Sequence, residues 1–437
     1  MEQEQSRVVV QVARYGLPAV VIIFYVTATL KFDYTPDSTF LALGPAGGSL
    51  SALGGGAAPS PLWQMLIQTG SWFHVSGLLT AKVLALFFSS CIVVLTYILG
   101  VEVLGDRLLA LCASLTLALE PPLLQLAPSG SPASLGLLLG LAALFFVLRN
   151  EYGIAAIIIG LCTLVLWQAV VLTLLVAGDI WLNSLDALRA RKAMLSVVMI
   201  SIGILSAGLF LTVLLGGGSI PVLIPFGDFS PVTFRLVGKT VALVLLAGAG
   251  VIAAWMSGPE GRLIVRTHIV PLLWMVWIAF QGILGHAEVW LLALPPLVLY
   301  AFWGLGEIVQ TRGWLRYVHL FGFAFAAVLL MLSQVEYLGA TNPCMREATE
   351  ASSQLTSIAL WLKTHSVDTT KIASDSPGIL GYYAQRSVDP LHTAPSREAD
   401  FIVIRVTPHQ GYEKVFQPVE VELGNHTRNY YAVWRRR

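Results

Sequence analysis

The sequence predicts a polytopic α-helical membrane protein that carries a small extracytoplasmic α/β domain at its C-terminal end. Apolar residues make up 56% of the 437 residues, charged residues make up only 12%, and the mean hydropathy is +0.75. Because a soluble domain carries about 25% charged residues, this composition indicates a chain embedded in a bilayer. The second observation is a change of character after residue 337, where charges and turn residues become frequent.

Apolar runs long enough to cross a membrane recur through most of the chain. A crossing helix needs about 20 largely apolar residues, and about eleven segments approach that length. They fall at roughly 12–30, 76–100, 108–126, 132–148, 153–167, 169–183, 194–216, 239–256, 268–284, 287–305 and 317–337. The two runs within 153–183 are short, and we predict them as separate spans.

Basic residues predict the orientation of these spans. Cytoplasmic loops carry an excess of lysine and arginine, which places the N-terminus in the cytoplasm and the tail outside. The domains are then a transmembrane domain at 1–337, with outer loops at 31–75 and 217–238, and an extracytoplasmic α/β domain at 338–437. We expect the first run to be a retained span and not a cleaved signal peptide, and a bacterial inner membrane is the expected location. The basic residues behind this assignment are Arg7, Arg14, Arg107, Arg149, Arg189, Arg191, Lys192, Arg262, Arg266, Arg312 and Arg316.

Shorter elements are expected outside the spans. Residues 61–73 suit a short amphipathic helix that lies flat in the membrane interface. The tail predicts a helix at 345–365, strands at 371–375, 401–406 and 430–434, and a turn at 376–378. A tail of this size can bury a small core of its own.

Two carboxylates, Asp33 and Asp37, follow directly on the first apolar run. Carboxylates at the mouth of a membrane protein are costly to desolvate and tend to mark sites of binding or chemistry. The net charge of +1 gives no electrostatic attraction to nucleic acid, and the four cysteines show neither a disulfide framework nor metal-ligand spacing. We therefore expect the lipid bilayer and a small ligand, rather than a nucleic acid, as partners.

Four stretches resemble motifs of the GT-C superfamily of membrane glycosyltransferases, in particular the bacterial protein mannosyltransferase and aminoarabinose transferase group. Tyr34-Thr-Pro-Asp-Ser-Thr-Phe-Leu41 is similar to its acidic first-loop motif. Phe226–Lys239 resembles its second outer loop, and His286–Pro296 resembles a proline-rich late span. Ile372–Asp389 resembles a glycine- and tyrosine-containing stretch of its soluble end. The resemblance implies a GT-C fold over most of the chain.

The same resemblance implies transfer of a sugar from a polyprenyl-phosphate donor. By match to the first-loop motif, Asp37 is the candidate base that takes a proton from the acceptor hydroxyl. Asp33 is a candidate for a second acceptor contact or for binding a divalent metal. The alternatives are that Asp37 caps a helix or turn after Pro36, and that Asp33 is a solvated loop residue.

The leaving group of such a reaction is a lipid phosphate, which needs cations at the membrane edge. Arg235 and Lys239 are the candidate phosphate ligands, because they are four positions apart and a helix would place both on one face. His286 is a third candidate phosphate ligand, and Glu288 is a second-line candidate for the site. The alternatives are that both basic residues reach lipid headgroups, that His286 is an interfacial hydrogen-bonded histidine, and that Glu288 faces a cavity.

The sequence also departs from the group's pattern, and a second function follows from these departures. Ser129-Gly-Ser-Pro-Ala-Ser-Leu135 lacks the glutamate of the matching motif, and Leu164–Ala169 lacks the usual arginine and glutamate. The first-loop acidic pair becomes Asp37-Ser38, and His286 or Glu288 stands where an arginine is expected. The alternative to an active transferase is therefore a catalytically silent GT-C relative that serves as a subunit of a larger membrane complex.

Overall fold

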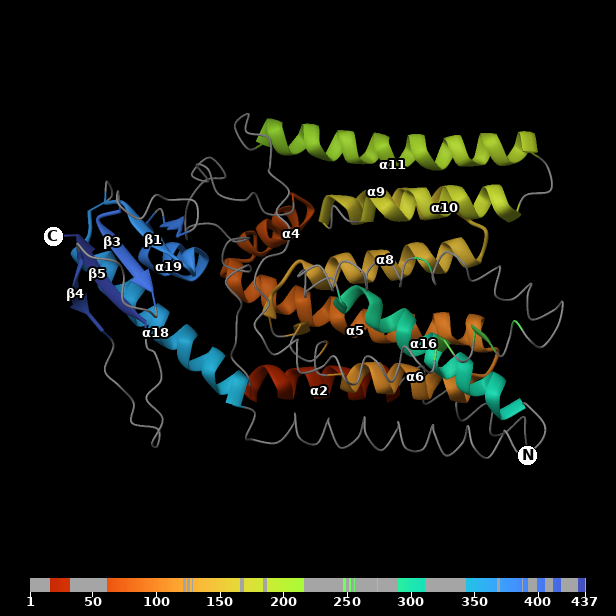
Figure 1. Ribbon diagram of the computed structural model, residues 1–437, viewed down its shortest axis with the longest axis horizontal. Coiled ribbons are helices and arrows are strands. Elements are labelled where there is room, and N and C mark those ends of the chain that lie inside the picture. Colours follow the sequence, from red (N-terminus) through yellow and green to blue (C-terminus); the bar gives the residue numbers. More distant parts are fainter. Residues whose placement is uncertain are drawn as a thin grey trace.

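The apolar runs fold as helices that lie side by side in the computed structural model, with an α/β region at one end (Figure 1). The structure describes residues 16–31, 61–120, 129–165, 169–183, 187–215, 290–310, 343–367, 370–386, 388–391, 399–404, 412–417 and 431–436, with isolated positions at 123–127 and 247–273. The described helices of the bundle are α2 (Leu17–Lys31), α4 (Pro61–Ser71), α5 (Gly77–Leu104), α6 (Arg107–Leu119), α8 (Ala133–Leu148), α9 (Tyr152–Val165), α10 (Val170–Asn183), α11 (Ala187–Leu215) and α16 (Trp290–Gln310).

Local sequence signals set the ends of α5 and α6. The Ser76 hydroxyl accepts the Leu79 N–H at 3.4 Å at the start of α5, and Gly105 ends that helix with a left-handed φ of 66°. The Asp106 carboxylate then begins α6 by accepting the Leu108 N–H at 2.7 Å. Such side-chain caps satisfy backbone donors that a helix leaves unpaired at its first turn.

The helices agree with most of the predicted apolar runs. The pair within 153–183 is confirmed as two helices, α9 and α10, while α11 begins at 187 rather than 194. The prediction of a span at 108–126 is wrong at its C-terminal end, because α6 stops at Leu119. Glu120-Pro-Pro122 follows, and proline cannot continue a helix. Within the described residues, Gly77–Leu104 is the helix with the length and composition to cross a membrane by itself. The run at 317–337 and most of 239–256 and 268–284 lie outside the described residues.

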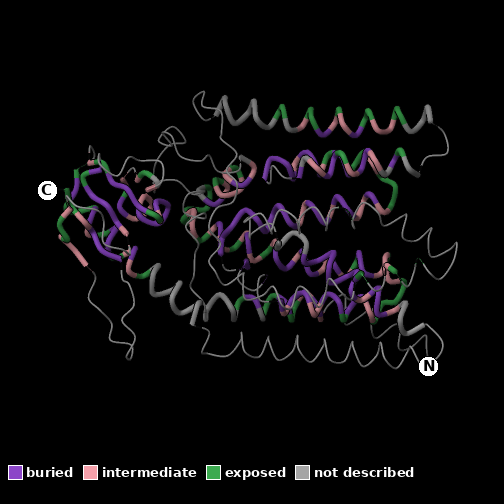
Figure 2. The backbone as a smooth tube through the Cα atoms, in the orientation of Figure 1, coloured by how far each residue is buried: buried purple, intermediate pink, exposed green. Residues whose placement is uncertain are grey.

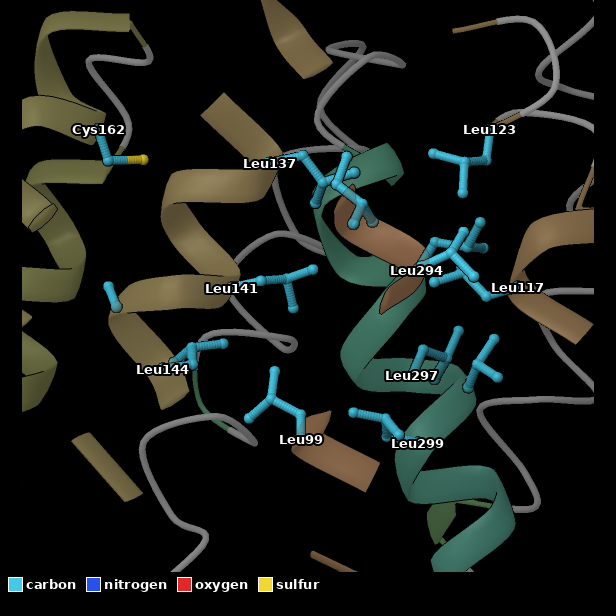
Figure 3. Packing of buried hydrophobic residues seen from close by; sticks show 14 of the residues in the cluster. Leu99, Leu117, Leu123, Leu137, Leu141, Leu144, Cys162, Leu294, Leu297 and Leu299 are labelled. Carbon is cyan, nitrogen blue, oxygen red and sulfur yellow. The ribbon is translucent and has the colours of Figure 1, made fainter. Parts of the chain in front are cut away.

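Leucine-rich packing joins the helices of the bundle. Buried residues line the facing sides of the helices, and exposed ones lie on the outside (Figure 2). Leu294, Leu297 and Leu299 of α16 lie against Leu117 of α6 and Leu99 of α5 (Figure 3). This contact closes the bundle between helices that are far apart in the sequence.

Arginine and glutamate join two helices at the end of the bundle where α5 stops. The Arg149 Nε donates to Glu102 Oε1 at 3.1 Å, and the Arg149 guanidinium lies 4.3 Å from the centroid of the Phe145 ring. Arg107, which begins α6, follows α5 closely in sequence and lies at this same end. Arg107 and Arg149 therefore share one end of the bundle, as the predicted orientation requires.

Small residues allow α9 and α11 to approach closely. The Ser201 hydroxyl donates to the Ala156 carbonyl oxygen across the pair at 3.1 Å. A Cβ placed on Gly160 would lie 2.8 Å from Ile204 Cβ and 3.2 Å from the Ser201 carbonyl oxygen. Close backbone approach of this kind, with a hydroxyl bond across it, is how membrane helices associate where burial of apolar surface gives little driving force.

Gly160→Ala is therefore expected to destabilise the protein by about 1–3 kcal/mol, the cost of overpacking a close contact. Gly153→Ala, in the same helix, is the matched control, because a Cβ there meets nothing within 4 Å. Thermal unfolding of both variants in one detergent measures the difference. Equal unfolding temperatures for the two would contradict the close approach of α9 and α11.

A mixed five-stranded sheet forms the α/β region. Its elements are α18 (Pro343–His365), β1 (Ile372–Ser374), α19 (Pro377–Ala384), β2 (Val388–Pro390), β3 (Phe401–Ile404), β4 (Tyr412–Phe416) and β5 (Ala432–Arg436). The strand order is β2-β1-β3-β5-β4, in which β1 runs parallel to both β2 and β3, and β5 runs antiparallel to both β3 and β4. One core lies between this sheet and α18 and α19, and Leu78 at the start of α5 packs against it.

The structure confirms the predicted tail helix and strands and corrects three details. Ser376-Pro-Gly378 is not a turn: Pro377 begins α19, as proline suits the first helical position. The strands β2 and β4 are absent from the predicted set. The sequence gives them little signal, because β2 has only three residues and β4 exposes Glu413 and Lys414. The amphipathic helix at 61–73 exists as α4, but Trp63 on its apolar side is fully buried against the bundle, 6.1 Å from Phe88 between ring centroids.

Candidate functional site

The candidate residues from the sequence all lie outside the described residues. Asp33, Asp37, Arg235, Lys239, His286 and Glu288 are therefore not placed by the structure, and their roles stay predictions. What the structure does place are the helix ends that flank two of them in the chain. Asp33 follows the end of α2 at Lys31, and Glu288 precedes the start of α16 at Trp290.

Several helix ends gather at the end of the bundle that bears α4, which we call the α4 end. The helix α5 begins there, since Leu78 contacts the α/β region. The helix α16 also begins toward this end. Its later residue Gly306 lies at the opposite end, because a Cβ added to Gly306 would be 3.6 Å from Leu109, near the start of α6. The helix α8 also begins toward this end with Ala133, whereas the shorter α6 ends inside the bundle at Leu119 (Figure 1).

Glu120 is a buried carboxylate at the end of α6, inside the bundle. Only 3% of the residue is exposed, and its backbone N–H donates to the Leu117 carbonyl oxygen at 3.0 Å. Leu117 and Leu123, which flank it, both belong to the leucine core. An ionisable residue within a membrane bundle is costly and usually functional. Glu120 is therefore the described residue with the strongest claim to a functional role.

Sequence reasoning misses Glu120 because this residue lies inside a run that is otherwise apolar. A signal is nevertheless present, since Glu120 is the single charged residue within 108–126. The two prolines that follow it also indicate that the helix ends there, which moves the carboxylate from mid-span to a helix terminus.

A buried serine segment connects the region after Glu120 to α8. The Ser129 hydroxyl donates to the Leu126 carbonyl oxygen at 2.7 Å and accepts the Ser131 N–H at 3.1 Å. The Ser131 hydroxyl accepts the Ala133 N–H at 3.2 Å, and the Ser134 hydroxyl donates to the Ser131 carbonyl oxygen at 2.9 Å. These hydroxyls bind backbone groups of their own segment, so they shape the turn. Pro132 stands where the resembling motif has its glutamate, at the start of α8.

Metal ligands do not cluster in the part of the chain that the structure describes: no group of three His, Cys, Asp or Glu side chains occurs there. The described cysteines are free thiols. The Cys162 Sγ of α9 donates to the Gly136 carbonyl oxygen of α8 at 3.3 Å, so this thiol contributes to helix packing. A divalent metal at Asp33 and Asp37 stays a prediction.

The resembling stretch of the α/β region has structural roles where its contacts are described. The Arg386 guanidinium donates to the Ser366 carbonyl oxygen at 3.0 Å, which ties the end of α19 to the end of α18. Burial raises the pKa of Tyr382 above its ordinary value. Outside that stretch, burial likewise raises the pKa of Tyr412 of β4, whose hydroxyl donates to the Ala399 carbonyl oxygen at 3.1 Å. Both phenols therefore stay neutral near pH 7 and provide no anion for catalysis.

Comparison with known proteins shows that the chain shares its fold with a solved membrane-lipid-binding protein structure. No family model and no curated protein matches the chain. ArnT from Cupriavidus metallidurans, solved bound to undecaprenyl phosphate, matches with a TM-score of 0.52 and 13% identity over 95% of this chain and 98% of that one. Arabinofuranosyltransferase AftD from Mycobacteria matches with a TM-score of 0.47 and 17% identity over 96% of this chain, which spans 41% of AftD. The likeness to ArnT shows a shared fold, which agrees with the fold that the sequence motifs imply.

Proposed function

We propose that the protein is a glycosyltransferase that moves a sugar from a polyprenyl-phosphate donor to an acceptor at the outer face of the membrane. The observation that carries the proposal is the fold, which is shared with ArnT over almost the whole of both chains. The ArnT structure contains undecaprenyl phosphate, the class of lipid that such a donor releases. The buried Glu120 supports the proposal, because an ionisable residue inside a membrane bundle is costly and usually functional.

The proposed reaction is a single displacement. Asp37 accepts the proton of the acceptor hydroxyl as that oxygen forms a bond to the anomeric carbon. The bond between the anomeric carbon and the phosphate oxygen breaks, and the lipid phosphate leaves with the electron pair. Arg235, Lys239 and His286 neutralise the phosphate charge, as cationic donors do in phosphate sites. Asp33 makes a second contact to the acceptor or binds a divalent metal, and Glu288 is a second-line candidate.

One observation favours the alternative, a silent subunit of a membrane complex. Pro132 replaces the glutamate of the resembling motif, and the neighbouring serine hydroxyls bind backbone groups rather than a ligand. A scaffold that keeps its fold while losing reactive groups is expected to show such exchanges.

Native mass spectrometry on gently extracted protein tests both functions. The transferase is expected to carry a bound mass that fits a polyprenyl phosphate or its sugar conjugate. Lys239→Ala is expected to weaken binding of polyprenyl phosphate about tenfold, the effect of losing one charge-assisted hydrogen bond. Lys363→Ala is the matched control, because that exposed lysine lies at the end of α18 in the α/β region. A fixed assembly with other membrane proteins, without such a lipid, would support the silent subunit instead.

A further inference from the structure

Two adjacent aromatic side chains are exposed on the turn between α4 and α5. Trp72 is 77% exposed and Phe73 is 76% exposed, and Val75 beside them is 37% exposed. Side chains of this size are normally buried, and a contiguous exposed apolar group marks an interaction surface. We call Trp72, Phe73 and Val75 the aromatic turn.

Backbone hydrogen bonds hold the aromatic turn in this conformation. The Phe73 and Val75 N–H groups both donate to the Gly70 carbonyl oxygen at 3.0 Å, and the Trp72 N–H donates to the Thr69 carbonyl oxygen at 3.2 Å. Gly70 also packs tightly against Thr80 of α5, because a Cβ on Gly70 would lie 2.0 Å from the Thr80 hydroxyl oxygen. The exposure is therefore built into an ordered turn.

The aromatic turn continues an exposed apolar stripe on α5. Leu79, Val83 and Phe87 recur at helical spacing and are 54%, 57% and 57% exposed, whereas Ala81 and Ala85 between them are fully buried. Because α5 is apolar and long enough to cross the membrane, this stripe faces lipid. The aromatic turn is the extension of that lipid-facing stripe beyond the first residue of the helix.

The length of α5 places the turn at the level of the headgroups. A helix of 28 residues is about 42 Å long, which exceeds a hydrocarbon core of about 30 Å. At the far end, the partly exposed pair Glu102 and Arg149 requires a polar environment. The surplus length then carries Gly77 and the aromatic turn out of the hydrocarbon on the α4 side. Indole rings favour this zone, because they are apolar with one polar N–H.

We propose that Trp72 and Phe73 insert into the headgroup boundary of the leaflet at the α4 end and fix the depth of the protein in the bilayer. The bilayer is the occupant because the turn is continuous with the lipid-facing stripe of α5. Leu78, between the aromatic turn and that stripe, packs against the core of the α/β region. The insertion therefore also holds the α/β region at a set height above the membrane. This role is independent of the proposed reaction.

Fluorescence quenching by brominated phosphatidylcholine tests the proposal on the full chain in lipid nanodiscs. The protein has 12 tryptophans, so the emission of Trp72 is obtained as the difference between the wild type and Trp72→Phe. This difference is expected to be quenched more by lipid brominated near the headgroup than by lipid brominated at the chain ends, and little by aqueous iodide. Trp361→Phe is the control, because that ring stacks between His365 and Phe416 in the α/β region. The difference emission of Trp361 is expected to be quenched by neither brominated lipid.

A second variant keeps the test decisive if Trp72→Phe folds poorly. Phe73→Trp adds an emitter at the neighbouring position, and its added emission is expected to show the same dependence on bromine depth. Iodide quenching without lipid quenching would overturn the proposal in favour of a turn exposed to water. Protection from both quenchers would overturn it in favour of a turn covered by a second copy or by another protein.

Discussion

Asp37→Asn is expected to slow sugar transfer by about 10²- to 10⁴-fold, the usual contribution of a general base. The amide has the shape of the carboxylate but cannot accept the proton of the acceptor hydroxyl. Donor binding is expected to change little, because the phosphate contacts belong to Lys239 and Arg235 in the proposed site. Single-turnover transfer from a radiolabelled polyprenyl-phosphate sugar, together with thermal unfolding, separates the chemical step from stability.

Asp106→Asn is the matched control for this substitution. Asp106 accepts the Leu108 N–H at 2.7 Å at the start of α6, at the end of the bundle opposite to α4. Asparagine caps a helix about as well as aspartate, so both activity and stability are expected to stay near wild type. Wild-type turnover in Asp37→Asn would remove Asp37 from the mechanism and leave its alternative role as a turn or capping residue.

Glu120→Gln is expected to reduce transfer about 10²-fold without lowering the unfolding temperature. The substitution keeps the volume and removes the carboxylate from a position that is 3% exposed. If the negative charge serves the reaction, its loss costs rate. Because glutamine keeps the volume of the side chain and one of its two oxygens, the unfolding temperature is expected to stay near that of the wild type. Transfer assays and thermal unfolding on the same preparations give both quantities.

Glu102→Gln provides the comparison with an exposed glutamate at the opposite end. It breaks the pair with Arg149, which at this exposure is worth about 0.2–1 kcal/mol, and activity is expected to stay unchanged. A Glu120→Gln protein with the activity of Glu102→Gln would show that the buried carboxylate has only a structural role.

Much of the helical bundle could be predicted because long apolar runs have few alternatives in a membrane. The errors occur where a local signal overrides the run. Proline after Glu120 ends α6 early, and the basic segment before 194 joins α11, since polar residues extend a helix past the hydrocarbon. In the α/β region, β2 and β4 escape prediction because very short or charge-bearing strands lack the alternation that identifies a strand.

The candidate site was less predictable, for a different reason. Position after the first apolar run marks Asp33 and Asp37, and motif resemblance gives Asp37 its role as a base, but no local pattern fixes how loop residues meet in space. Glu120 shows the reverse case, because no motif marks it, and its burial adds to the one sequence signal that it has, a single charge in an apolar run. The orientation of α4 also required the structure. An apolar helix face suits lipid and protein equally, and Trp63 is fully buried against α5.

The strand order of the α/β region dictates the order in which it can be assembled during synthesis. The strand β5 lies between β3 and β4 and pairs with both, although it follows β4 in the chain. Among the described strands β4 pairs with β5 alone, so β4 emerges from the ribosome before it has a neighbour to bond. The parallel trio of β2, β1 and β3 can form earlier, with its β3 edge open. The sheet is therefore complete only once β5 has been synthesised, because β5 pairs with the open β3 edge on one side and with β4 on the other.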